Sequence, residues 1–523
     1  MPSSFDAIII GGGSNGLVTA ARLAANGWRT VLLEARAATG GQLTPEVDVD
    51  GERSLSMRPV RLAAPIDRWL RETRALPPEL AAWPHPDPVV ALAADGRPCL
   101  LTEEQAYAGD AVPGYLPFAN TASRLAAIIA PLVRRPPPDV DRPRLTDLRS
   151  LLSTASRLRR LNRAEAPALF RWPPMPVADL VREWFADETV RAAVAGIPLV
   201  GRNTSPRAPW SSLALLWDRA LLAGGGRAVL FRGGPAALGT AMADAARRAG
   251  AELRTGCPVR QVTVREGRAT GVVLADGREL SARAVVSCAD PRATLLDLVE
   301  PAEIDPEIRD EIRHLRGSGS VAVLSMDVDA VPVLPGASWS ETAKLLGAAG
   351  GHVFIGPTLD DLEKAYDAAK YGAPSPVPIL DLMAPDVLDP PQNGSPQRVT
   401  MTAQHVPSAT GKRVGQAGLE GEALATLERA WPGFGSRVRA IRGASPATIE
   451  RVWRITGGHV HHLEMAPDQL FTMRPHPAFA RYETPIQGLF LCGAGTHPGG
   501  GAPGLPGWIA SRVVSRALKR RHA

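Results

Sequence analysis

The stretch FDAIIIGGGSNGLVTAARLAANGWRTVLLE, residues 5–34, has the pattern of a strand, a glycine turn, a helix, a second strand and a closing acid. Residues 7–10 are continuously apolar, which is typical of a strand covered on both faces. Gly11, Gly13 and Gly16 complete the G-x-G-x-x-G spacing. The first glycine allows a tight turn, the second lets the backbone approach a pyrophosphate, and the third lets the helix pack closely on the sheet. The pattern predicts a dinucleotide-binding βαβ unit.

The end of this unit indicates which nucleotide it binds. The helix expected over residues 17–25 directs its first N–H groups at a phosphate, and Gly27 ends it. Glu34 follows the second strand, residues 28–33, where its carboxylate accepts hydrogen bonds from both ribose hydroxyls. A 2′-phosphate would be repelled there, so NADP is disfavoured.

Two further glycine segments favour FAD over NAD. Residues 35–42, ARAATGGQ, bring Gly40 and Gly41 to a second turn beside the same nucleotide, which a plain NAD domain does not need. Near the C-terminus, residues 488–507 read GLFLCGAGTHPGGGAPGLPG. Residues 489–492 form a short buried strand, and the three glycines from Gly499 begin a helix that runs through residue 514. A flavin is long enough to need phosphate-side contacts from distant parts of a chain, and its ring needs close backbone without side chains.

These motifs carry a resemblance to a known family. The opening fingerprint, the double-glycine extension, GLFLCGAGTHPGGG (488–501) and GGHVHHLEMAPDQLFTMRPHP (457–477) are similar to those of the FAD-dependent phytoene-desaturase-like oxidoreductases. This family belongs to the carotenoid desaturase/isomerase superfamily. The chain resembles most its non-carotenogenic pyridine nucleotide-disulphide oxidoreductase domain branch. The stretch 233–299 fits as well, whereas residues 70–170 match loosely and are expected to influence substrate choice.

The resemblance implies an α/β fold: a Rossmann-like FAD-binding domain of the glutathione-reductase/amine-oxidase type with a discontinuous α+β substrate domain. The FAD domain is expected to comprise residues 1–70, 225–300 and 478–523, and the substrate domain residues 71–224 and 301–477. By analogy, the backbone of Val259 contacts the adenine. The residues expected to contact non-covalently bound FAD are Gly11, Gly13, Ser14, Asn15, Gly16, Glu34, Ala35, Gly40, Gly41, Val259, Gly493, Gly495, Gly500 and Gly501.

Composition excludes several other classes of protein. The four cysteines of the 523-residue chain have no C-x-x-C spacing, which argues against a zinc site, a disulfide scaffold and the disulfide-reductase flavoproteins. No run of about 18 apolar residues and no basic leader is present, so we expect a cytoplasmic protein. The net charge of +6 is modest, and no aromatic and basic platform indicates nucleic acid. The basic clusters 157–163 and 519–521 leave peripheral contact with a membrane surface open.

The electron acceptor follows from a missing second nucleotide site. Residues 228–231 are strand-like and precede Gly233, Gly234 and Gly239, but Pro235 interrupts the pattern and no ribose-binding acid follows. Reduced flavin is therefore expected to pass its electrons to oxygen, a quinone or another acceptor. The oligomeric state does not follow from the sequence.

Histidines are the best candidates for handling the substrate's proton. His497 lies inside the C-terminal glycine motif and is expected to approach the flavin ring. His462 matches a family position, whereas His459 and His461 depart from the commoner residues, and His461→Ala is expected to be nearly silent. Asp468, Gln469 and Arg474 also match the family pattern and either fix their loop or touch substrate.

The predicted function is hydride removal from an organic, apolar small molecule by a flavin-dependent desaturase or oxidase. Trp172, Trp184, Trp210 and Trp217 either line an apolar tunnel or belong to the core, which is the usual place for large aromatics. Two alternatives remain open. One is an isomerase assisted by reduced FAD without net redox change, and the other is a non-catalytic lipid or partner carrier of the same fold lineage.

Overall fold

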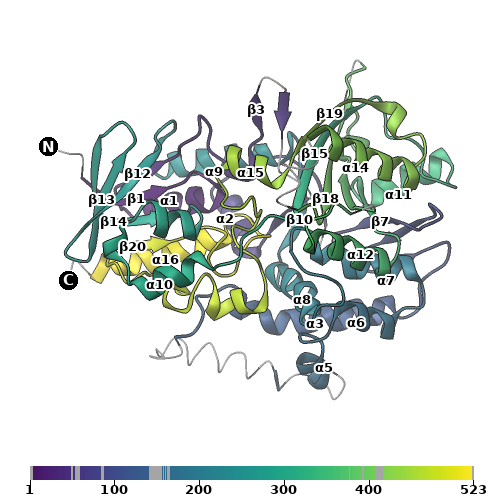
Figure 1. Cartoon of the computed structure of the whole chain (residues 1–523), viewed down its shortest axis with the longest axis horizontal. Helices are drawn as coiled ribbons and strands as arrows, with labels where there is room; N and C mark the ends of the chain where they lie inside the picture. Colours follow the sequence, from purple (N-terminus) through teal and green to yellow (C-terminus); the bar gives the residue numbers. More distant parts are fainter. Residues whose placement is uncertain are drawn as a thin grey trace.

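The computed structural model describes residues 4–48, 51–53, 59–83, 87–139, 156, 158–159, 161, 165–375, 377–391, 394–407 and 416–520. Two sheets with their helices lie side by side, with both chain termini beside the first (Figure 1). Of the basic cluster 157–163, the structure describes residues 158, 159 and 161. In the cluster 519–521, Arg521 lies outside the described residues.

The first sheet has a parallel centre built from three distant segments of the chain. Strand β1 (Ser4–Ile10) lies between β2 (Thr30–Leu33) and β14 (Glu279–Ser287), with Ile9 opposite Leu32 and Val286. The remaining strands complete the order β11-β2-β1-β14-β13-β12, with β20 paired to β14. They are β11 (Glu252–Arg254), β12 (Val259–Arg265), β13 (Arg268–Leu274) and β20 (Leu489–Leu491). The predicted Rossmann-like fold is confirmed, while the exact domain boundaries stay a prediction.

Helix α1 (Ser14–Ala25) covers this sheet and packs against α9 (Gly234–Arg248) and α16 (Leu505–Arg520). α16 starts later than predicted, because Gly499 and Gly501 have φ angles of +101° and +97°, which a right-handed helix cannot contain. Two further helices, α2 (Ala64–Glu72) and α10 (Pro306–Arg313), belong to this region.

The second sheet has eight strands in the order β19-β15-β18-β17-β16-β7-β8-β9, and only β16 and β7 pair in parallel. Along β7, Val89 and Ala91 enter one core while Val90 and Leu92 enter another, so its apolar run reflects cover on both faces. The strands are β7 (Val89–Leu92), β8 (Pro98–Leu101), β9 (Ala106–Tyr107), β15 (Val321–Val328), β16 (His352–Ile355), β17 (Ile379–Met383), β18 (Gln397–Gln404) and β19 (Val438–Ala444).

Helices cover both faces of this sheet. Residues of α14 (Gln416–Ala430) and α11 (Trp339–Ala348) share one core with it. On the other face lie α3 (Tyr115–Val133), α6 (Val177–Trp184), α7 (Glu188–Gly196), α8 (Ser211–Leu222) and α12 (Leu359–Lys370). The remaining α-helices of the described residues are α5 (Glu165–Arg171) and α15 (Pro446–Trp453).

Short strands complete the fold. Strand β10 (Arg227–Phe231), the strand of the second glycine pattern, pairs with β5 (Val60–Leu62) and β6 (Glu79–Trp83) in a separate sheet. A hairpin is formed by β3 (Glu46–Asp48) and β4 (Gly51–Arg53).

Three of the four tryptophans of the helical layer, Trp172, Trp184 and Trp217, pack against other side chains of the protein. Trp172 stacks on Phe118 with ring centroids 5.3 Å apart, and Trp184 meets both rings edge-on. Trp217 donates to the Pro498 carbonyl, and Trp210 is exposed. These side chains therefore do not form the apolar tunnel that the sequence analysis left open as an alternative. Among the described helices, only α3 is long and apolar enough to cross a membrane. A core helix can have the same length and composition, and α3 packs against α8.

The contact between α1 and α16 generates a stability prediction. A Cβ on Gly507 would lie 2.2 Å from the Asn15 carbonyl oxygen, so Gly507→Ala should destabilise the fold by about 1–3 kcal/mol through overpacking. Gly421→Ala is the matched control, because this helical glycine of α14 meets nothing within 4 Å and alanine favours a helix. Urea unfolding should show opposite shifts in the midpoint, and equal shifts would contradict the packing argument.

Candidate functional site

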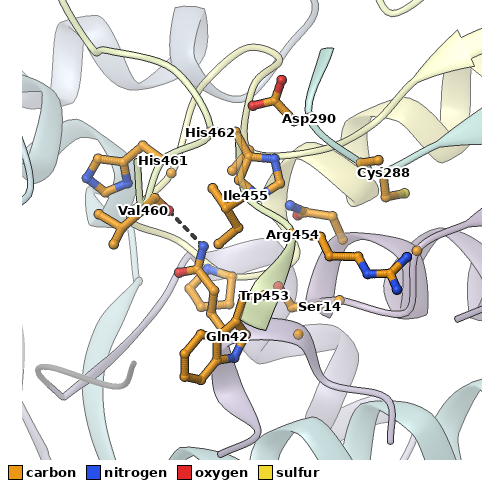
Figure 2. Close-up of a pocket in the computed structure, with 18 of the residues that line it drawn as sticks. Ser14, Gln42, Cys288, Asp290, Trp453, Arg454, Ile455, Val460, His461 and His462 are labelled. Carbon is orange, nitrogen blue, oxygen red and sulfur yellow. Dashed lines mark hydrogen bonds between the residues drawn. The ribbon is translucent and has the colours of Figure 1, made fainter. Parts of the chain in front are cut away.

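One large cavity, of about 690 Å³, lies at the carboxyl ends of β1, β2 and β14. Its walls come from the first sheet, from β5 of the separate sheet and from the segments 200–202, 453–462 and 494–503. Figure 2 shows part of the segment 453–462 against Ser14 and Gln42. Ligands of open α/β sheets bind at this edge, and the volume is that of a pocket for a cofactor or a drug-sized molecule. The hydrogen bond from Gln42 Nε2 to the Val460 carbonyl, 2.8 Å long, ties the nucleotide end to the loop after α15.

The two glycine turns meet at the cavity, where the sequence predicts a phosphate cradle. Gly11 has a φ of +96°, and the Gly40 N–H donates to the Gly12 carbonyl at 2.8 Å. A Cβ on Gly41 would lie 2.9 Å from Gly13 Cα, so the two turns meet backbone to backbone. Helix α1 begins directly behind them with no side-chain cap, so its first N–H groups face the cavity at Ser14 and Asn15. An anion such as a pyrophosphate fits these donors.

Gly16 supports this cradle from behind and does not line the cavity. A Cβ there would lie 2.0 Å from the Gly11 carbonyl oxygen, so only glycine lets α1 approach the turn.

Glu34 lines the cavity with Ala35 and Val259, at the end that the sequence predicts for adenosine. It is buried, and its Oε2 accepts from the Gly12 N–H at 2.6 Å while Oε1 accepts from the Arg36 N–H at 2.8 Å. A carboxylate has about four acceptor positions, so ribose hydroxyls can still donate to it. Glu34 therefore also fixes the glycine turn, a role that spacing alone does not reveal.

The C-terminal glycines divide into two groups. Gly500 and Gly501 line the cavity as predicted, whereas Gly493 and Gly495 do not. A Cβ on Gly493 would lie 2.7 Å from the Cys288 carbonyl oxygen, and one on Gly495 would lie 2.3 Å from the Pro291 ring. These two glycines let the chain leaving β20 pass close to the chain leaving β14.

The structure places His461 in the cavity wall and His497 outside it, which is the opposite of what the sequence predicts for these two histidines. His461 and His462 line the cavity, and a Cβ on Gly500 would lie 2.1 Å from His461 Nδ1. His497 is fully buried outside the lining, between Trp217 and Phe471, and its Nε2 bonds to the Leu132 carbonyl at 3.0 Å. The prediction that His497 approaches the flavin ring loses its geometric basis, and His461 gains one.

The other family-matched side chains organise the loop. Arg474 is fully buried and donates to the carbonyls of His461 and Ala494, both at 2.8 Å, as well as to other loop carbonyls. Asp468 forms an ion pair with Arg316, and Gln469 accepts from the Arg316 N–H. Of the two roles considered for them, fixing the loop is the one that the structure supports.

A buried ionic group in the lining is not evident from the sequence. Arg61 lies 3.0 Å from both Asp87 and Asp218, and Arg202 pairs with Asp218. Burial alone would lower the pKa of Arg61, but the two carboxylates raise it above its ordinary value. The pairs join residues up to 157 positions apart, so no local pattern marks them.

Cys288 and Asp290 also line the cavity and carry no predicted role. Burial raises the pKa of the Cys288 thiol well above its ordinary value, so it is not a reactive thiolate. Across the described ranges, no group of three or more histidine, cysteine or acidic residues is placed to hold a metal ion.

The buried histidines generate a pH prediction. Burial lowers the pKa of His497 and of His459 to about 3, and burial with the charge of Arg474 lowers the pKa of His462 to about 4. Their unfolded pKa is about 6.5, so between these values the unfolded chain binds more protons. Stability should therefore be complete above pH 6.5 and fall on acidification, by about 1.4 kcal/mol per pH unit and histidine.

Denaturant unfolding from pH 5 to 8 measures this dependence. His497→Gln should reduce its slope, whereas His314→Gln, at an exposed histidine, should not. A stability that is constant from pH 5 to 7 would contradict the burial of neutral histidines.

Comparison with known proteins agrees with the cradle. A family model described as "FAD dependent oxidoreductase" matches residues 6–380. The chain is 30% identical over 549 residues to the rat protein "Pyridine nucleotide-disulfide oxidoreductase domain-containing protein 2", covering 98% of this chain and 94% of that protein. It is 27% identical over 535 residues to hydroxyneurosporene desaturase of Cereibacter sphaeroides, covering 98% of both.

The fold is also found among solved structures. Cyclohexylamine oxidase from Brevibacterium oxydans superposes with a TM-score of 0.58 at 14% identity, over 100% of both chains. The glycine turns, the buried Glu34 and the match to the family model agree on the cofactor. The chain belongs to the FAD dependent oxidoreductase family, and it is an oxidoreductase whose cofactor is FAD.

Proposed function

We propose that this enzyme desaturates or oxidises an organic small molecule by removing a hydride and a neighbouring proton. The observation that carries the proposal is the continuity of the cavity. The glycine turns and the side chains of Arg202, His461 and His462, from the segments 200–202 and 453–462, line one space. When bound, FAD supplies a hydride acceptor for an otherwise unreactive C–H bond.

The residues of the chain divide the work between holding FAD and positioning substrate. Gly11, Gly13 and the first N–H groups of α1 would bind the pyrophosphate, and Glu34 would bind the ribose. Gly500 and Gly501 leave space for the part of FAD that carries the ring. The wall formed by the loops at 200–202 and 453–462 then orients the substrate and excludes water.

Support for the substrate class comes from the same wall. Val60, Val200, Ile455 and Val460 provide apolar surface for the apolar body that the sequence predicts. Arg61, Arg202 and Asp218 add ion-paired groups, which cost free energy when apolar surface displaces water from them. We therefore propose a substrate with an apolar body and a polar end.

The electron acceptor and the location of the enzyme also remain proposals. We propose oxygen, a quinone or another acceptor, because the sequence offers one dinucleotide fingerprint. A cytoplasmic location is supported by four free cysteines, Cys99, Cys257, Cys288 and Cys492, which a reducing compartment preserves.

Anaerobic mixing with candidate substrates tests the function directly. A desaturase or oxidase should bleach the oxidised flavin stoichiometrically, because two electrons stay on FAD when no acceptor is present. An isomerase would convert substrate without net bleaching. Wild-type protein that converts or bleaches with no compound in a broad screen would contradict the proposal.

FAD should be bound without a covalent link, and Gly13→Val should abolish its retention. A Cβ on Gly13 meets only Gly41 Cα at 3.9 Å, so the apo fold tolerates a side chain that blocks the pyrophosphate. The variant should lose the ligand's stabilisation, about 4 kcal/mol at a thousandfold excess over Kd.

Absorbance after acid precipitation and the melting temperature provide the measurements. FAD should appear in the supernatant of the wild type. Gly421→Val, on the open helix α14, is the control and should keep its flavin. Yellow colour in the pellet would refute non-covalent binding, and equal flavin content in Gly13→Val would remove this turn from the site.

His461→Ala should now slow flavin reduction, contrary to the expectation from sequence. His461 lines the cavity between Gly201 and Gly500, so its loss changes the wall that faces the ligand. His497→Ala should instead lower stability by about 1–3 kcal/mol, because it leaves the buried Leu132 carbonyl without its donor. Stopped-flow reduction and urea unfolding distinguish the two variants. Unchanged reduction in His461→Ala together with slow reduction in His497→Ala would reverse this assignment again.

A further inference from the structure

Two buried polar atoms in the cavity wall have no hydrogen-bond partner among the residues that the structure describes. They are Asp290 Oδ2 and His462 Nδ1. The two side chains belong to one part of the wall, because a Cβ on Gly495 would contact both the Pro291 ring and His462 Cβ, at 2.3 and 3.5 Å. Figure 2 shows Asp290 and His462 in this part of the cavity. Unpaired polar atoms are costly inside a protein, so both indicate a ligand that completes them.

The position of Asp290 is fixed by local structure. Asp290 follows β14 by three residues, and its Oδ1 accepts from the N–H groups of Arg292 and Ala293 at 2.8 and 3.4 Å. This oxygen therefore caps the helical segment that begins at residue 291. The cap orients the carboxyl group and leaves Oδ2, the second oxygen of this lining residue, without a hydrogen-bond partner among the described residues.

The charges around Asp290 decide its protonation. The groups facing it are the guanidinium groups of Arg292 and Arg474 and the Thr456 hydroxyl, with His462 in the same wall. Burial raises the pKa of Asp290 to about 6, against the opposing effect of Arg292, the capping N–H groups and Thr456. His462 has a pKa of about 4 and is neutral at pH 7, so it is a weak proton acceptor. A base works best when its pKa lies near the working pH.

We propose that Asp290 is the catalytic base of the cavity, with Oδ2 taking the substrate's proton and neutral His462 completing the hydrogen bonding of the same group. The assignment rests on the proposed function. The hydrogen of one substrate atom leaves with its electron pair for FAD. The bond from the neighbouring atom to its hydrogen breaks heterolytically, and that electron pair forms the new double bond while the proton passes to Oδ2. Substrate loses two electrons, FAD gains them, and oxygen or a quinone later removes them.

The test compares wild type, Asp290→Asn and a matched control, all loaded with FAD. Asparagine keeps an oxygen for the cap and removes the proton acceptor. Asp305→Asn is the control, because Asp305 also precedes a proline and caps a helix, α10, but is exposed and outside the lining. The first measurement is the melting temperature from pH 4 to 8, with and without FAD. The second is the anaerobic rate of flavin reduction from pH 5 to 9, with a substrate found by screening the wild type.

Melting tests the environment of Asp290 without any substrate. An acid whose folded pKa is raised destabilises the protein where it ionises, so stability is lost as the pH rises from about 4 to 6. Asp290→Asn should therefore melt above wild type at pH 8, and the difference should vanish at pH 4. Asp305→Asn should show no such pH-dependent gain. Parallel profiles for wild type and Asp290→Asn would overturn the assignment.

Flavin reduction tests the catalytic role. The wild-type rate should rise with pH through an inflection near 6, and Asp290→Asn should be at least a hundredfold slower without that inflection. A variant as fast as wild type would overturn the assignment and leave the proposed function standing. Loss of FAD from Asp290→Asn at all pH values would also overturn it, by making Asp290 a cofactor ligand. If no compound reduces the wild-type flavin, the proposed function fails and this assignment fails with it.

Discussion

Helix α1 is held by backbone that approaches too closely for any Cβ atom, and the cavity depends on this contact. Behind its first turn, Gly16 meets the Gly11 carbonyl, and along its side Gly507 of α16 meets the Asn15 carbonyl. In front, Gly41 meets Gly13. These contacts fix the first N–H groups of the helix in one place and direction, which is what a phosphate needs from a helix N-terminus. Glycines near both ends of the chain therefore allow the close backbone contacts that position α1.

Burial then determines the charges that the cavity offers. Burial lowers the pKa of Arg474 to about 9, which still leaves it charged at neutral pH. It donates six hydrogen bonds to five loop carbonyls. Burial in dry surroundings, together with this fixed cation, lowers the pKa of the nearby histidines and keeps them neutral. The same dryness has the opposite effect on a carboxyl group, since it disfavours whichever form is charged. One physical cause thus makes His462 a poor proton acceptor and Asp290 a suitable one.

The sequence predicts well those features whose function requires a fixed local spacing. The turn at Gly11–Gly13 and the acid at Glu34 are such features, because strand, turn and helix follow each other without interruption. Proximity in the sequence was misleading for His497, which lies three residues before Gly500 but points into the core beside Trp217. The Arg61 and Asp218 pair was out of reach, since a strand and a helix 157 residues apart supply it.

Asp290 escapes sequence reasoning for a different reason. An aspartate before a proline and ahead of a helical turn is the ordinary pattern of a helix cap, and Asp290 does cap its turn with one oxygen. Only the fold shows that the other oxygen is buried beside a loop that begins about 170 residues later. The carboxyl ends of parallel strands supply the Asp290 side of the wall, and the loop after α15 supplies His462. Neither segment forms a site alone, so the proposed reaction centre exists only where the loop after α15 lies over the edge of the first sheet.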